Sequence, residues 1–224
     1  MHLALFDLDD TLLDGDCSAL WNGWMVERGW VDAPGEFLAH AQAMDAAYHT
    51  GRLRLEKYLS LTLAPLAGRH VNEVDAEVAD FVAARILPRL FAQGRARIAE
   101  HCARGETPMI ISASSRHLVA PIAAELGIEA VIAVEPALES GYFTGGTTGI
   151  LSYRDGKIAR LEQWLAEKGA VSHLTFYSDS QNDLPLLGRV DRPVAVNPDA
   201  VLAEVARVEG WERLDWRPCA ALVG

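Results

Sequence analysis

Two carboxylates stand at the end of a short apolar run near the start of the chain. The run begins at Leu3, and Asp7 and Asp9 follow each other two positions apart where it ends. It predicts a buried strand, because it is far shorter than the roughly 20 residues of a membrane helix. A chain that leaves a strand can turn both carboxylates toward one point. Clustered carboxylates are tolerated where a cation or a proton-transfer task compensates them, so Asp7 and Asp9 are the first candidates for catalysis.

Other polar side chains follow apolar runs further along the chain. Ser112 ends one such run, and Asp179, Asn182 and Asp183 follow another. Lys157 comes directly after an Asp-Gly turn. Because ligands of open parallel sheets bind at the carboxyl ends of the strands, we expect these side chains to converge with the first two carboxylates. Four carboxylates, a hydroxyl, an amide and a lysine would then meet at one edge of a sheet.

The patterns between these residues indicate how they are positioned. Strands alternate with helices over much of the chain, which predicts an α/β fold with a Rossmann-like parallel sheet and helices on both faces. We expect a hairpin within 137–153. The expected strands are 1–8, 108–112, 130–134, 173–178 and 193–196, and the expected helices are 116–126, 157–168 and two that begin near 182 and 199.

A long helical stretch interrupts this alternation. Apolar residues recur at helical spacing from residue 17 to about residue 104. We interpret the stretch as an α-helical cap that is inserted after the first strand and packs over the sheet edge. The expected domains are therefore an α/β core at 1–14 and 91–224 and a helical cap at 15–90.

Composition and charge exclude several classes of protein. The 224 residues carry a formal charge of −11 without a Lys/Arg cluster, which argues against a nucleic-acid partner. No apolar stretch approaches a membrane span and no export segment is recognisable, so we expect no membrane partner and a cytoplasmic location. Cys17, Cys102 and Cys219 lack metal-type or redox-type spacing and predict free thiols. The oligomeric state stays open.

Four short motifs occur in order along the chain. They are the DLDDT segment at 7–11, Ser112, Lys157 and the DSQND segment at 179–183. The ordered set resembles the haloacid dehalogenase superfamily in its phosphatase branch, over residues 1 to about 198. The helical insertion between the first two motifs is similar to the cap of the phosphoserine-phosphatase-like subgroup, of the subfamily IB type.

The resemblance implies a phosphatase that hydrolyses a small phosphomonoester with Mg²⁺. Asp7 would attack phosphorus and form an aspartyl phosphate, and Asp9 would act as acid and then base. Lys157 would offset the charge between the nucleophile and the phosphate. Mg²⁺ would be held by Asp7, the backbone carbonyl of Asp9 and Asp179. Asp183 would bind the metal through water or support the site.

The resemblance also implies where the phosphoryl oxygens bind. Ser112, the backbone N–H at Ala113 and Asn182 would hold them. A phosphotransferase and a phosphoserine phosphatase of the same fold are alternatives. A carbon–halogen hydrolase needs neither a metal nor the second acid, and a scaffold protein commonly loses a motif acid, so the intact motifs argue against both.

Several candidates have a structural alternative. Asp7 and Asp9 could hold a turn or cap a helix, and Ser112 could end its strand without a further role. Lys168 competes with Lys157 for the position of the lysine motif. Asn182 could cap the helix that begins near it.

The cap residues bear on the substrate. Asp16 could bind a substrate ammonium group or act as a helix N-cap, and Trp21 and Tyr48 could form an aromatic wall or belong to the core. In phosphoserine phosphatases of this family an arginine follows a cap glycine by ten residues. With Gly51 as that glycine, the position here is Leu61, which cannot bind a carboxylate. An acid with aromatic side chains suits an amine- or imidazole-bearing phosphate such as histidinol phosphate.

Overall fold

The computed structural model describes residues 1–49 and 52–217, without the side chains of Asp45, Tyr48 and His49. Within these ranges the strands form one sheet in the order β4-β3-β2-β1-β5-β6-β7. Their bounds are β1 (His2–Phe6), β2 (Thr107–Ser115), β3 (Ala130–Glu139), β4 (Tyr142–Thr148), β5 (His173–Ser178), β6 (Arg192–Val196) and β7 (Glu212–Leu214). Neighbouring strands are parallel except β3 and β4, which pair antiparallel as the expected hairpin.

Strand β1 lies inside the sheet, between β2 and β5. Leu5 is paired with Met109 on one side and with Phe176 on the other. Successive strands are therefore added on one side of β1 as far as β4 and on its other side from β5 onward. In open parallel sheets, ligands bind in the crevice at such a point. Asp7 follows the last residue of this strand, so the topology places it at the centre of that crevice.

The sheet is covered on both faces, as the run of apolar residues in β1 predicts. Leu3 and Leu5 pack in a buried cluster with side chains of α7, α8 and α9, whereas Ala4 and Phe6 belong to the cluster that contains side chains of α5 and α6. Successive side chains of a strand point to opposite faces, so a fully apolar strand requires two apolar covers. The predicted Rossmann-like α/β fold is thus confirmed.

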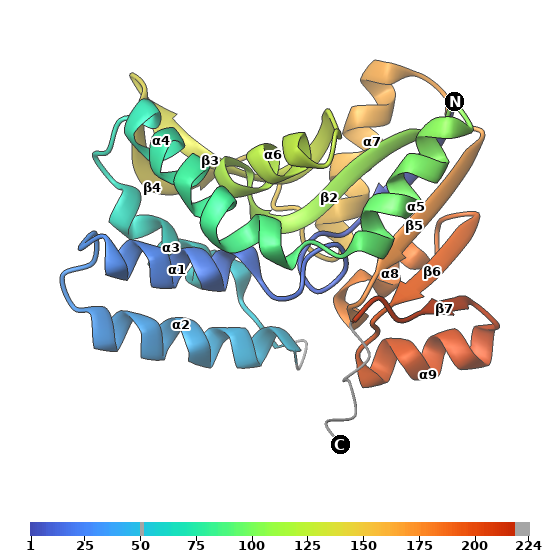
Figure 1. The fold of residues 1–224 in the computed structure, drawn as a ribbon, viewed down its shortest axis with the longest axis horizontal. Helices are drawn as coiled ribbons and strands as arrows, with labels where there is room; N and C mark the ends of the chain where they lie inside the picture. Colours follow the sequence, from blue (N-terminus) through green and yellow to red (C-terminus); the bar gives the residue numbers. More distant parts are fainter. Residues whose placement is uncertain (50–51, 218–224) are drawn as a thin grey trace.

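The helices of the described residues divide between the sheet and the insertion. Figure 1 shows α1 to α4 gathered at the β3–β4 end of the sheet, where α3 contacts β4 and α4 contacts α6. This confirms a helical insertion after the first strand. The bounds are α1 (Cys17–Glu27), α2 (Pro34–His49), α3 (Leu55–Leu63), α4 (Val71–Phe81), α5 (Ala92–Ala103), α6 (Arg116–Glu125), α7 (Asp155–Lys168), α8 (Leu184–Leu187) and α9 (Ala200–Glu209).

Four short helical turns complete the described elements. Residues Val82–Ile86 continue α4 as a π-helical turn. The others are 3-10 turns, at Ala64–Leu66, Leu87–Arg89 and Gln181–Asp183.

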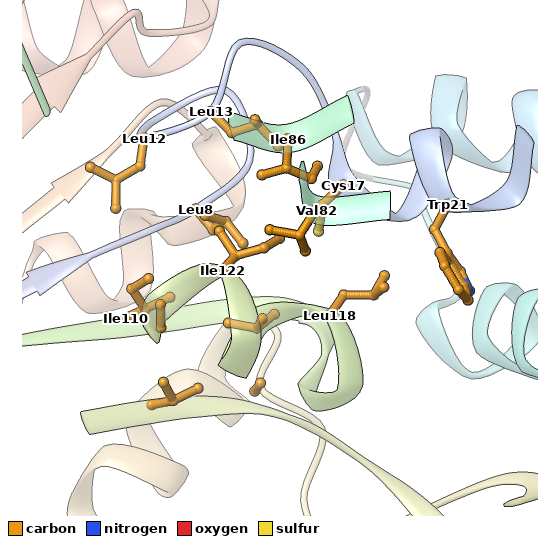
Figure 2. Close-up of a cluster of buried hydrophobic side chains, with 14 of the residues drawn as sticks. Leu8, Leu12, Leu13, Cys17, Trp21, Val82, Ile86, Ile110, Leu118 and Ile122 are labelled. Atoms are coloured by element: carbon orange, nitrogen blue, oxygen red, sulfur yellow. The ribbon is translucent and has the colours of Figure 1, made fainter. Parts of the chain in front are cut away.

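The insertion and the sheet share one hydrophobic core. Leu8, Leu12 and Leu13, from the loop after β1, gather with side chains of the insertion and of α6 (Figure 2). Val82 and Ile86 are among the side chains that the insertion contributes to this core, and both are at most 3% exposed. The end of the insertion is therefore packed against the sheet layer and is not a free linker.

Strand β7 was not expected from the sequence. It is short and pairs parallel with β6, Val194 lying opposite Glu212. Its sequence Glu-Arg-Leu carries too few apolar residues to show a strand period, so only pairing with β6 identifies it. None of the helices in the described part of the chain has the length and apolarity needed to cross a membrane.

We predict that Gly156→Ala destabilises the protein and reduces its activity. A Cβ atom at Gly156 would lie 1.9 Å from the backbone oxygen of Leu151, so the first turn of α7 must shift. Overpacking of this kind costs about 1–3 kcal/mol of unfolding free energy. Lys157 is the next residue and moves with it. Urea unfolding and a phosphatase assay measure the two effects.

Gly23→Ala is the matched control for this prediction. Gly23 lies inside α1, and nothing lies within 4 Å of the added Cβ atom. Alanine in a helix interior is favoured over glycine by roughly 0.5–1 kcal/mol, so this variant should be slightly more stable. Equal effects of the two substitutions would contradict the close approach at Gly156.

Candidate active site

Asp7 stands at the carboxyl end of β1 with its side chain almost fully buried. It is 3% exposed, and its backbone N–H donates to the carbonyl of Tyr177 on β5. The Lys157 ammonium donates to Oδ1 of Asp7 at 3.0 Å. The carboxylate is therefore oriented by a cation from α7, a distant part of the chain.

Asp9 is oriented by two donors from different elements. The backbone N–H of Cys17, at the start of α1, donates to Oδ1 at 2.7 Å, and the Ser114 hydroxyl of β2 donates to Oδ2 at 2.8 Å. Ser18 in turn donates to the Ser114 hydroxyl at 3.0 Å. Asp10 adopts a positive φ of 53°, which turns the chain sharply out of the strand. Asp7 and Asp9 line the same cleft before this turn.

Lys157 is a buried cation between two carboxylates. Its side chain is 1% exposed, and its Nζ lies 3.0 Å from Asp7 and 2.7 Å from Asp183. Ser178 also donates to Asp183, at 2.7 Å. Burial lowers the pKa of Lys157, but the charges of Asp183 and Asp7 outweigh burial and hold that pKa above its usual value. Lys157 therefore stays charged and fixes both carboxylates.

Asp179 lies next to this group at the end of β5. The Thr11 hydroxyl donates to its Oδ1 at 3.0 Å, which links the loop after β1 to the loop after β5. Burial raises the pKa of Asp179 well above its usual value, and the charge of Asp7 adds to the rise. The carboxylate is thus destabilised by negative charge nearby, which is the environment that a bound cation relieves.

The charge balance of the cluster is negative. Lys157 offsets a single charge among Asp7, Asp9, Asp179 and Asp183. Burial, only partly offset by Lys157, raises the pKa of Asp7 to about 7. Burial and then the charge of Asp7 raise that of Asp9 to about 6. Carboxylic acids that titrate near neutrality can take up and release protons at physiological pH.

The donor set fits a hard cation such as Mg²⁺. Within the described residues no three His, Cys, Asp or Glu side chains are grouped as a metal site. A cation here would accordingly rest on two carboxylates, those of Asp7 and Asp179, with backbone carbonyl and water oxygens completing its shell. Mg²⁺ commonly binds in this way, with few carboxylates and several waters.

A cleft opens over Asp7 and Asp9. Its far wall comes from the insertion, where Leu53, Leu55 and Tyr58 present apolar and phenolic surface. None of the described lining residues is Lys or Arg. The described residues that line the cleft are Asp7, Asp9, Asp16, Ser18, Leu53, Leu55, Tyr58, Ala113 and Ser114.

Asp16 has one of the two roles that the sequence left open, that of a helix N-cap. It is the N-cap of α1, with its side chain accepting from the N–H of Ala19 at 2.8 Å. It also lines the cleft, on the side of the insertion. The Asp16 carboxylate is therefore positioned by the cap at the edge of the cleft.

Of the three residues predicted to bind the phosphoryl group, Ser112 and Asn182 lie outside the cleft lining. The Ser112 hydroxyl accepts from the N–H of Ser114 at 3.0 Å, beneath the cleft. Asn182 is 2% exposed, and its Oδ1 accepts from Tyr153 and Arg154. Arg154 has a φ of 52°, an uncommon conformation for a residue with a side chain. Ala113, which was predicted beside Ser112, does line the cleft.

The aromatic wall expected from the sequence is not seen at Trp21. Helix α1 turns this side chain inward, where its ring packs edge to face on Phe81 at 5.1 Å and on Trp30 at 5.8 Å. Trp21 is 2% exposed and belongs to the core. The side chain of Tyr48 lies outside the described residues, as do Gly51 and Cys219. Tyr58 supplies the aromatic ring of the cleft instead.

Sequence reasoning missed several residues of the site. The Ser114 hydroxyl donates to Asp9, and Ser114 lies two positions after the predicted Ser112. Its place near the end of a strand could have identified it as a site residue. Leu53, Leu55 and Tyr58 carried none, because apolar residues at helical spacing predict core, and only the docking of the insertion turns them toward the cleft.

Comparisons with known proteins agree with this geometry. The model of the haloacid dehalogenase-like hydrolase family matches residues 4–188. A curated relative from Neisseria meningitidis, named histidinol-phosphatase, is 37% identical over 221 residues, which cover 96% of this chain and 99% of that protein.

Solved structures share the fold. A Bordetella pertussis protein of unknown function has a TM-score of 0.90 and 35% identity, covering 96% of this chain and 99% of the other. A phosphoserine phosphatase, solved as an analogue of its phospho-aspartyl intermediate, has a TM-score of 0.68 and 18% identity, covering 96% and 93%. A family match over most of the chain and a relative that aligns nearly from end to end show that this chain belongs to the haloacid dehalogenase-like hydrolase family.

Proposed function

We propose that this phosphatase is a Mg²⁺-dependent hydrolase of small phosphomonoesters that works through a phosphorylated Asp7. The observation that supports it is the Asp7 carboxylate, fixed by Lys157 at the end of the central strand and open to a cleft that Asp9 also lines. A carboxylate held in this way can attack phosphorus in line, and the resulting acyl phosphate divides hydrolysis into two easier steps.

Asp9 is the general acid and base in this proposal. Its pKa of about 6 lies close to neutrality, so it can hold a proton for the leaving alcohol and later take one from water. The donors from Cys17 and Ser114 fix its position while it does so. Because they also favour its charged form, they prevent the pKa from rising further.

The bound metal supplies charge compensation for the phosphoryl group and the carboxylates. Asp7, the Asp9 carbonyl and Asp179 would hold it, and Asp183 acts by fixing Lys157. Ala113 lines the cleft, where its backbone N–H would bind the phosphoryl oxygens, and Ser112 and Asn182 would support that loop and its neighbour. We further propose residues 15–90 as the cap domain and 1–14 with 91–224 as the core.

The substrate is proposed to carry an amine or imidazole group and no carboxylate group. The described cleft lining contains the Asp16 carboxylate and no Lys or Arg. A substrate cation therefore has a partner, whereas the carboxylate of phosphoserine would be desolvated without one. Histidinol phosphate meets these conditions, and the Neisseria meningitidis relative named histidinol-phosphatase adds support.

For this proposed function, the first prediction concerns the metal. Since the pKa of Asp7 is raised to about 7 in the metal-free protein, the folded state binds more protons than the unfolded state between about pH 4 and 7. The free energy of unfolding contributed by Asp7 therefore falls as the pH rises through that window, by at most about 1.4 kcal/mol per pH unit. Mg²⁺ needs the ionised form, so it should raise the melting temperature more at about pH 8 than at about pH 5.

Differential scanning fluorimetry with Mg²⁺ and with EDTA measures these shifts. Asp7→Asn is the control, and its Mg²⁺ shift should be small at both pH values. Activity should vanish in EDTA and return with Mg²⁺. An equal Mg²⁺ shift at both pH values, or activity that survives EDTA, contradicts the metal assignment.

The second prediction concerns the nucleophile. Asp7→Asn should remain folded and lose activity toward an aryl phosphate by roughly 10³-fold or more, because the amide cannot attack phosphorus. Asp10→Asn is the matched control, since asparagine adopts the left-handed conformation of Asp10 readily and should leave most of the activity. Substantial activity in Asp7→Asn would refute the nucleophile.

The third prediction concerns specificity. The kcat/KM for histidinol phosphate should exceed that for phosphoserine. Asp16→Asn keeps an N-cap for α1 while removing the charge, so KM for histidinol phosphate should rise about 10-fold. KM for an aryl phosphate without an amine should change little. A similar loss for both substrates would show that Asp16 acts on structure alone.

A further inference from the structure

Three buried polar atoms have no hydrogen-bond partner among the residues that the structure describes. They are Nε1 of Trp21, Oδ1 of Asn22 and Nε2 of His117. Trp21 and Asn22 are each 2% exposed, so bulk water does not reach them. A buried polar group without a partner costs about 1–3 kcal/mol, and native proteins seldom leave such groups unpaired.

All three residues line one small cavity. It lies between α1, α3 and the start of α6, and its remaining lining is Ser18, Leu59, Thr62, Leu63, Ser115 and Leu118. The space open to the centre of a water-sized sphere is about 10 Å³. That is close to the smallest cavity that holds one water molecule.

The chemistry of the three atoms is complementary. The Trp21 indole N–H can only donate, and the Asn22 amide oxygen can only accept. The other end of the Asn22 amide faces Tyr58, with Nδ2 3.5 Å from the phenolic oxygen. A water molecule donates two hydrogen bonds and accepts two, so it can satisfy a donor and an acceptor at once.

His117 completes this set as a neutral ring. Its Nδ1 is 2.9 Å from the Ser115 hydroxyl, and its ring lies 5.9 Å from that of Trp21 and 5.7 Å from that of Phe143. Burial lowers the pKa of His117 to about 3. The Nε2 atom of a neutral ring donates or accepts according to the tautomer, and either state bonds to water.

We propose that one ordered water molecule occupies this cavity, accepts from Trp21, donates to Asn22 and bonds to Nε2 of His117. The water joins α1 to the first turn of α6. These are the elements next to the two donors that hold Asp9, the N–H of Cys17 and the hydroxyl of Ser114. Ser18 lines both the active-site cleft and the cavity, so the water lies directly behind the site.

A crystal structure of the full chain and an NMR experiment test this site. We expect a single water peak within hydrogen-bond distance of all three atoms. In solution, the indole Hε1 of Trp21 should show a water cross-peak with the sign of a long-lived contact. The indole of Trp24 is the internal control, because its Nε1 donates to Glu77 at 3.1 Å and should show none.

His117→Phe tests the origin of the cross-peak. The phenyl ring removes the Nε2 partner, so the cross-peak at Trp21 should disappear while that protein remains folded and keeps its other indole signals. A cavity without density, together with no water contact at Trp21 in the wild type, overturns the proposal. A Trp21 cross-peak that His117→Phe leaves unchanged overturns the assignment of the water to this set of atoms.

Discussion

The buried ion pair network around Lys157 is the constraint on which the rest of the site depends. Its ammonium group touches Asp7 and Asp183 within a volume that water does not reach. Loss of one member of such a network leaves a buried charge uncompensated, which costs about 3–5 kcal/mol. The sheet order that places β5 beside β1 and the tight packing of Gly156 on Leu151 both serve this contact. Fold and chemistry are thus coupled through one cation.

The same network explains the reactivity of the remaining acids. Lys157 offsets too little charge to balance the cluster, so burial raises the pKa of Asp7, Asp9 and Asp179. A proton relieves this repulsion at Asp9, and a divalent cation can relieve it between Asp7 and Asp179. An acid that titrates near neutrality beside a nucleophile is what a two-step hydrolysis requires. The proposed metal and the proposed acid would thus be two responses to the same excess of negative charge.

The helical insertion contributes to the site in two ways. Its first residues supply the N–H that binds Asp9, and Asp16 both caps α1 and lines the cleft. Its third helix begins at Leu55, and with Tyr58 that residue forms the far wall. Asp7, the proposed nucleophile, is thus held by the sheet, whereas the far wall of the cleft belongs to the insertion. Specificity can change in the insertion without disturbing the ion pairs under it.

The sequence by itself determined the α/β class, the helical insertion, the positions of most strands along the chain and the candidate acids of the site. These features follow from local apolar periods and from motifs whose members end predicted strands, as Asp7 and Asp179 do. Only the tertiary structure decided that β7 pairs with β6, that Trp21 points into the core and that Ser114 binds Asp9. The reason is physical: a helical period shows that one face is buried, but the neighbouring element decides whether that face meets a core, a cleft or a cavity.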